Sequence, residues 1–193
     1  MQTTGGAVRD DWERERFERL MLPHLDAAYG LARWLTRNDE LAEDAVQEAY
    51  LRALRFFGTL RGDDARPWLL RIVRNACYEL LQREPAAGTT EDFDEELHGA
   101  DVAAAGAVIV LPVNPEAAAI ARADRELVRE CLAALPRDFR EALVLREIEG
   151  CSYKEIADIV GAPIGTVMSR LARARRLLQG VISERVKSRQ TGT

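Results

Sequence analysis

Hydrophobic residues recur at three- and four-residue steps along most of the chain, which is the spacing of one face of an α-helix. The alternation typical of a β-strand is absent, and the one β-branched run, at residues 107–113, is short and includes Pro112. The pattern therefore predicts an all-α protein. Pro23 should kink or split the first helical stretch. The apolar face of that stretch consists of Phe17, Leu20, Met21, Leu25, Ala28, Leu31 and Leu35.

Start and stop signals divide the first part of the chain into three or four helices. Asn38 is a residue type preferred at a helix N-cap and predicts a helix directly after it. Asp63 or Asp64 then caps another helix, which carries basic and aromatic side chains. We interpret residues 11–84 as one compact helical bundle.

The composition changes between residues 85 and 114, where glycine, alanine, threonine and acids replace the helical pattern. We expect a flexible acidic linker there, because such a composition cannot form a packed core. A segment of this length without secondary structure argues against a loop inside a single domain. The chain is therefore predicted to contain two small helical domains.

Residues 115–180 form the second of these domains. Pro115 suits the first position of a helix, and Pro136 starts another helix that should end at Gly150. Two further helices follow, so we expect a four-helix domain. Residues 181–193 form a basic tail after it.

The segment "CSYKEIADIVGAPIGTVMSRLARARRLL", residues 151–178, has the signals of a helix-turn-helix. Ser152 and Glu155 have the spacing of a capping box at the start of the first helix. Gly161 marks the turn, and Pro163 opens the second helix.

A helical wheel gives this second helix two faces of different chemistry. The outward face is small at its start and cationic further on, which suits a DNA major groove: small residues allow deep entry, and arginine can bind guanine or phosphate. Lys154, on the preceding helix, is placed to meet the DNA backbone. An arginine-rich solvated face is the competing interpretation. The inward set is Ile164, Val167, Leu171, Ala174 and Leu178, and the outward set is Gly165, Ser169, Ala172, Arg173 and Arg176.

Charge is unevenly distributed along the chain. The formal net charge is −5, which alone would argue against a nucleic-acid partner. Residues 84–101 contain seven acids and no Lys or Arg, whereas residues 163–193 contain seven Lys or Arg and one acid. The acidic total therefore hides a basic carboxy-terminal part.

Several classes of protein and site are not indicated. Cys77, Cys131 and Cys151 form no C-x-x-C pair and no Cys/His cluster, so we expect reduced, mostly buried thiols and no metal site. Phosphate-loop, G-x-S-x-G and H-E-x-x-H motifs are absent, so neither an enzyme nor a cofactor is expected. No apolar run approaches the roughly 20 residues of a membrane span. We expect a cytoplasmic protein without membrane insertion.

Three segments together resemble bacterial RNA polymerase sigma factors of the extracytoplasmic-function class. They are "DELAEDAVQEAYLRAL" at residues 39–54, "LRGDDARPWLLRIVRNACYELLQR" at residues 60–83 and "LPRDFREALVLREIEGCSYKEIADIVGAPIGTVMSRLARARRLL" at residues 135–178. The resemblance implies that the first domain binds the β′ clamp of core RNA polymerase and opens the minus-ten promoter element. It implies that the second domain binds the minus-thirty-five element and the β flap.

The resemblance also assigns roles to individual residues. An acidic helix face suits a basic partner on the polymerase, and arginines near an unstacked strand suit phosphates and extruded bases. Trp68 is expected in the core, and Met168 stands where many relatives have a polar or basic residue. The polymerase set is Asp44, Gln47 and Glu48; the minus-ten set is Arg61, Gly62, Asp63, Arg71, Arg74 and Asn75; and the minus-thirty-five set is Lys154, Gly165, Thr166, Ser169, Arg170, Arg173 and Arg176.

These observations predict a sigma factor whose partners are core RNA polymerase and promoter DNA. Family members are usually held inactive by an anti-sigma factor, so the resemblance implies such a partner as well. The alternative is a stand-alone, two-domain helix-turn-helix regulator, which would bind duplex DNA unaided.

Overall fold

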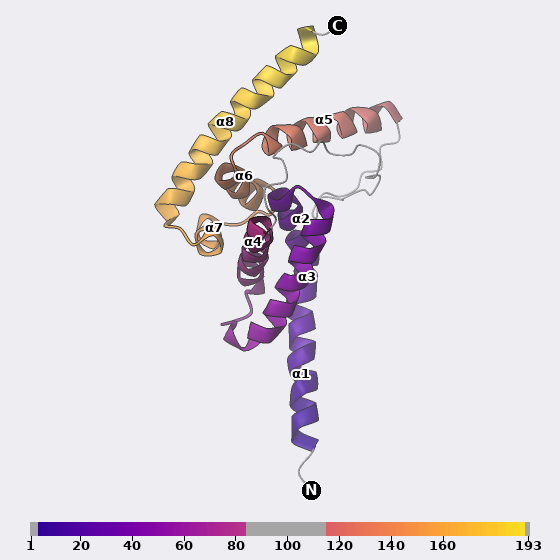
Figure 1. The fold of residues 1–193 in the computed structure, drawn as a ribbon, viewed down its shortest axis with the longest axis vertical. Helices are drawn as coiled ribbons and strands as arrows, with labels where there is room; N and C mark the ends of the chain where they lie inside the picture. Colours follow the sequence, from indigo (N-terminus) through magenta and orange to yellow (C-terminus); the bar gives the residue numbers. More distant parts are fainter. Residues whose placement is uncertain (1–3, 84–114, 192–193) are drawn as a thin grey trace.

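A computed structural model describes residues 4–83 and 115–191, and every element in those ranges is helical (Figure 1). The expected all-α fold is confirmed, as is its division into two helical units. The predicted acidic linker and its β-branched run at residues 107–113 lie outside the described residues.

The first unit has four α-helices and two 3₁₀ turns. Pro23 lies in the first of these turns, which separates α1 from α2 as predicted. α1 begins well before residue 11 and projects from the body of the molecule (Figure 1). The elements are α1 (Thr4–Met21), η1 (Leu22–His24), α2 (Leu25–Thr36), α3 (Asp39–Phe56), η2 (Phe57–Thr59) and α4 (Ala65–Arg83).

Small residues allow the helices of the first unit to pack closely. α2, α3 and α4 contact one another, and α3 presents alanines to its neighbours. The predicted N-cap is confirmed, because the Asn38 side chain accepts a hydrogen bond of 3.0 Å from the backbone N–H of Leu41. Leu25 departs from the predicted apolar face: it is exposed, since the 3₁₀ turn changes the phase of the helix that follows. The buried alanines of α3 are Ala42, Ala45, Ala49 and Ala53.

The second unit contains the four expected helices. A π-helical turn follows α6, and α8 continues without a break to Thr191, so the predicted basic tail is largely a continuation of that helix. The elements are α5 (Pro115–Ala133), α6 (Arg137–Leu143), η3 (Val144–Ile148), α7 (Tyr153–Val160) and α8 (Ile164–Thr191).

The helix-turn-helix is formed by α7 and α8. Ser152 and Glu155 make both hydrogen bonds of the predicted capping box, and Gly161 closes α7 in the left-handed conformation, with φ of 67°. Val167 is buried on α8 as predicted, whereas Ile164 is not: its side chain is exposed because it begins the helix beside the open turn.

The two units pack against each other. α4 contacts α7, and α2 contacts α6. Figure 1 shows α7 beside α4, while the far half of α8 extends away from the first unit toward α5. Any surface on this side of α4 is therefore covered by the helix-turn-helix domain.

Ser152→Ala is expected to lower the free energy of unfolding by about 1 kcal/mol, because it removes the side-chain acceptor of a helix N-cap. Ser183→Ala is the matched control. Ser183 is exposed within α8 and donates to the Gln179 carbonyl, a contact that adds little to a helix. Urea unfolding followed by circular dichroism measures both variants, and equal effects would contradict the capping role.

Candidate polymerase and nucleic-acid interfaces

The three predicted polymerase-binding residues lie together on α3. They line a shallow hollow between α3 and α4, so one partner surface can contact all three at once. Arg52 holds Glu48 in place, because its Nε donates to a Glu48 carboxylate oxygen at 2.7 Å. The lining residues of the hollow are Asp44, Gln47, Glu48, Leu51, Leu80 and Arg83.

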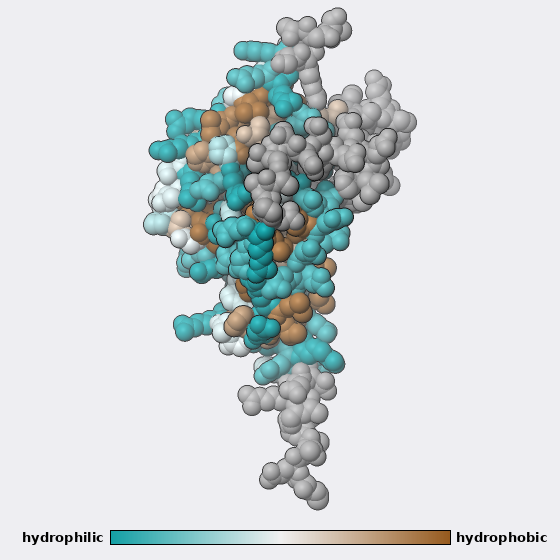
Figure 2. Space-filling view, viewed as in Figure 1, coloured by the Kyte–Doolittle hydropathy of each residue, from teal (hydrophilic) through white to brown (hydrophobic). Residues whose placement is uncertain are grey.

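An apolar rim beside this hollow was not predicted from the sequence. Leu51 lines the hollow, Leu54 lies one helical turn further along α3, and Phe56 lines a neighbouring hollow together with Leu51. The three side chains are 59%, 55% and 51% exposed, in that order. Figure 2 shows brown, hydrophobic surface over the lower part of α3 in the orientation of Figure 1. Hydrophobic spacing alone could not reveal this rim, because an exposed apolar residue and a buried one carry the same sequence signal. We call Asp44, Gln47, Glu48, Leu51, Leu54 and Phe56 the α3 patch.

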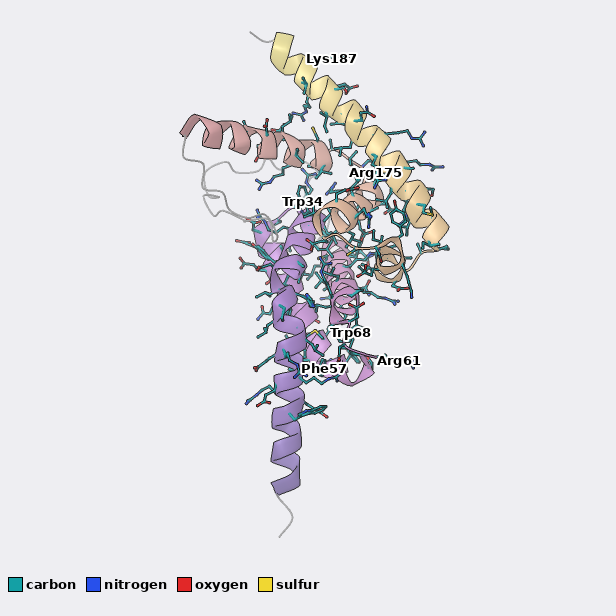
Figure 3. The ribbon with its side chains drawn as sticks, turned by 180° about the vertical axis from the view of Figure 1, so that it is seen from behind. Trp34, Phe57, Arg61, Trp68, Arg175 and Lys187 are labelled. Carbon is teal, nitrogen blue, oxygen red and sulfur yellow. The ribbon has the colours of Figure 1, made fainter. Side chains whose placement is uncertain are left out.

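The loop part of the predicted minus-ten set is accessible. Arg61 and Asp63 are exposed between η2 and α4, and Gly62 has a φ of 76°, a conformation that favours glycine. Arg16 of α1 donates to the Gly62 carbonyl and to the Asp63 carboxylate, each at 3.4 Å. Figure 3 shows Arg61 at the tip of this connection, near Trp68 and Phe57.

The helical part of the minus-ten set is divided between two faces of α4. Arg71 and Asn75 are exposed and four residues apart, so they share one face. Trp68 is half-buried and packs against the core, as expected. Arg74 instead points toward the second unit, where its Nε lies 2.6 Å from a carboxylate oxygen of Glu141. The predicted set is therefore only partly brought together in this conformation.

Most of the predicted minus-thirty-five set lies on the outer surface of the helix-turn-helix. Gly165, Ser169, Arg173 and Arg176 are exposed on α8, and Lys154 is exposed on α7. Thr166 is half-buried, and its carbonyl accepts a hydrogen bond from the Ser169 hydroxyl at 2.9 Å.

Among the arginines of α8, Arg170, Arg175 and Arg185 each pair with a carboxylate of their own domain. Arg170 pairs with Asp138 at 3.0 Å, and Arg175 pairs with Glu147 at 2.8 Å. Arg173 lies between them in the sequence and is exposed on the outward face. Arg170 belongs to the predicted minus-thirty-five set, and its guanidinium would first have to leave Asp138 to meet DNA.

The start of α8 presents an apolar edge. Ile164 and Met168 are about half exposed, at 49% and 53%, and are one helical turn apart. Gly165 lies between them in the sequence, and Ala172 lies one helical turn after Met168. Both are too small to cover the two apolar side chains. These two side chains form an apolar spot on an otherwise cationic face. In a DNA major groove, the group that such a spot can contact is the methyl group of thymine.

In residues 4–83 and 115–191, no group of three or more His, Cys, Asp or Glu could hold a metal ion. None of the described helices is both long enough and apolar enough to cross a membrane.

Comparisons with known proteins match both units in the order in which they occur. Residues 20–85 match the family model Sigma-70 region 2, and residues 125–178 match Sigma-70, region 4. The ECF RNA polymerase sigma-E factor of Escherichia coli is 34% identical over 145 residues, which are 75% of each chain. The RNA polymerase sigma-H factor of Pseudomonas aeruginosa is 34% identical over 171 residues, 86% of each chain.

The chain belongs to the extracytoplasmic-function family of RNA polymerase sigma factors. Solved structures agree with this assignment. The sigma factor RpoE of Bartonella quintana, in complex with the anti-sigma factor NepR, has a TM-score of 0.66 and 26% identity, covering 86% of this chain and 96% of that one. CnrH, in complex with the cytosolic domain of CnrY, shares the fold with a TM-score of 0.59 and 23% identity, covering 87% and 88%. The sigma factor therefore serves transcription initiation, and the stand-alone regulator is not favoured.

The cysteines of the sigma factor lie away from these surfaces. Cys77, Cys131 and Cys151 are all buried and free of disulfides. Burial raises the pKa of the Cys77 thiol to about 12 and that of Cys151 to about 11. Both stay protonated at neutral pH, and a protonated thiol is a poor nucleophile.

Ellman's reagent is expected to react with the native sigma factor at pH 8 far more slowly than with free cysteine. In guanidinium chloride the three thiols should react promptly, because unfolding exposes them and returns the pKa values of Cys77 and Cys151 to their ordinary range. Absorbance of the released thiolate gives both rates. A fast-reacting thiol in the folded protein would contradict the burial seen here and reopen a redox role.

Proposed function

We propose that this sigma factor is a cytoplasmic, non-enzymatic promoter-specificity subunit, with residues 11–84 and 115–180 acting as separate binding domains. The first domain binds core RNA polymerase and the minus-ten element, and the second binds the minus-thirty-five element. One observation carries this proposal: the α3 patch and the outward face of α8 lie on different units of one chain. The first is acidic with an apolar rim, which suits a protein partner, and the second is cationic, which suits DNA.

The α3 patch supports a polymerase partner. Its acidic residues suit a basic surface, while its apolar rim supplies area whose burial stabilises a complex. The Arg52–Glu48 contact keeps part of the patch in one conformation before binding, which reduces the entropy lost on association. The β′ clamp is the proposed occupant.

Two surfaces support promoter binding. Arg61, in the loop before α4, and Arg71 and Asn75, on one face of α4, are exposed and are proposed to hold the unpaired minus-ten strand. On α8, Ser169 and Arg173 are proposed to read bases while Arg176 contacts phosphate. The exposed Met168 is proposed to meet a thymine methyl.

An anti-sigma factor is the proposed regulator. The support is the likeness to the Bartonella quintana sigma factor, which was solved in complex with the anti-sigma factor NepR. The match covers 96% of that sigma factor and 86% of this chain. The identity of the regulator and its signal are separate questions from promoter binding.

Run-off transcription with purified core polymerase on a genomic promoter library tests the function. The sigma factor should create start sites that share two spaced motifs. Leu51→Asp should weaken core binding about tenfold or more, because it places a charge in the exposed apolar part of the α3 patch. Leu22→Asp, at another exposed leucine (53%), is the control. No new start sites, together with tight binding of the protein alone to duplex DNA, would favour the stand-alone regulator.

Arg173→Ala should weaken binding of the holoenzyme to duplex containing the minus-thirty-five element by about 1–3 kcal/mol, as expected for loss of a base contact. Arg175→Ala removes an arginine two positions away that already pairs with Glu147 and should have a smaller effect. Fluorescence anisotropy at fixed salt compares the two, since phosphate contacts are sensitive to salt. Equal losses would indicate a general charge effect instead of base reading.

A further inference from the structure

Two carboxylates of the second domain bind arginines on α4. Arg74 donates to both carboxylate oxygens of Glu141, at 2.6 and 3.3 Å. The Glu141 side chain has no exposed surface, and that of Arg74 is 20% exposed. The pair joins residues 67 positions apart in the chain.

A second pair repeats this arrangement near the start of α4. Arg66 donates to a carboxylate oxygen of Glu149 at 2.9 Å and to the Glu149 carbonyl. Gly30 of α2 makes room for this carboxylate: a Cβ at that position would lie 3.3 Å from Glu149 Oε1. The contact therefore depends on a close approach between the two units.

Additional contacts complete the junction. Arg140, almost fully buried, donates to the Trp34 carbonyl of the first unit at 3.3 Å. Two guanidinium groups lie over the ring of Tyr78 on α4. Arg74 is 4.5 Å from the ring centroid, and Arg137 of the second unit is 5.2 Å from it. Cationic and aromatic groups on this face of α4 are thus largely occupied by the second domain.

Carboxylates and DNA phosphates are recognised by arginine through the same chemistry. Both are anions with paired oxygens that accept charge-assisted hydrogen bonds from the guanidinium fork. An arginine held by Glu141 or Glu149 is unavailable to a phosphate. The two ligands are therefore mutually exclusive at Arg74 and Arg66.

We propose that the surface of the second domain around Glu141 and Glu149 is an intramolecular mimic of DNA, which occupies Arg74 and Arg66 in the free chain and must leave before α4 binds a promoter strand. The proposal rests on the proposed function for the identity of the competing ligand. The closed arrangement itself can be measured without polymerase.

The contacts are suited to release as well as to closure. The free energy lost when two charges leave water offsets most of the free energy gained from their attraction. A buried ion pair therefore contributes little net stability to the closed arrangement. When the domains separate, all four side chains regain water together and none is left buried alone. The ion pairs themselves therefore add little to the free energy that polymerase and promoter must supply to open the chain.

Closure is measured by electron resonance distances between nitroxide labels at Glu18→Cys in α1 and Gln179→Cys in α8, both exposed positions. The native cysteines are buried. The full-length free protein should give one narrow distance distribution. Glu149→Gln and Glu141→Gln should broaden it. Glu149→Gln covers the case in which Glu141→Gln fails to fold, because the Glu149 side chain keeps some exposed surface whereas that of Glu141 has none.

Binding is measured with fluorescein-labelled oligothymidine as the single-stranded probe. If the wild type is mostly closed, opening should tighten binding about tenfold, because apparent affinity scales with the fraction of competent molecules. Glu147→Gln is the matched control. It removes the same charge two residues away, from a pair within the second domain, and should change neither the distances nor the binding. Arg74→Ala added to Glu149→Gln should reduce the gain.

The proposal is overturned by a wild-type chain that is already broadly distributed in distance, by variants that open without binding the probe more tightly, or by Glu147→Gln tightening binding as much as Glu149→Gln. These outcomes are distinguishable from failure of the proposed function. A chain that is open when free can still direct transcription, and a chain that gives no new start sites can still be closed by these carboxylates.

Discussion

The contact between Glu141 and Arg74 is the interaction on which the arrangement of the two units depends. A carboxylate with no exposed surface is stable in its charged form only when cations or hydrogen-bond donors surround it. Burial raises the pKa of Glu141, while the Arg74 guanidinium opposes that shift. Because the donor belongs to the first unit, the second cannot bury this residue alone. Burial of Glu141 therefore requires the two units to lie together, as they do where α7 packs on α4.

Much of the local structure could be predicted from the sequence. The Asn38 cap, the Ser152 capping box and the left-handed Gly161 each depend on interactions within a few residues, and all are found in the structure. The prediction for Ile164 was wrong because a helical wheel assigns faces without knowing where a helix begins relative to its neighbours. The Arg74–Glu141 pair could not be predicted, since nothing in either local pattern specifies a partner so distant in the chain.

The candidate sites show the same limit. Acidic residues on α3 and cationic residues on α8 could be named from motif and resemblance, and the structure places both groups at the surface. The sequence could not show which of these arginines are available to bind DNA. Arg173 faces outward, whereas Arg170 is paired with Asp138. Availability depends on tertiary neighbours, and a sequence reveals charge without revealing its partner. The apolar rim of the α3 patch was missed for a related reason, as burial is a property of the fold.

The π-helical turn at Val144–Ile148 makes the junction depend on residue count as well as residue type. The backbone N–H of Glu149 bonds to the Val144 carbonyl five positions earlier, so this turn holds one residue more than an α-helical turn would. Each residue of a helix advances the chain by about 100° around the axis. Loss of a single residue from this segment would carry Glu149 to another side of the helix and away from Arg66. Two homologous sigma factors with the same charged residues can therefore differ in how their domains meet, through one insertion or deletion.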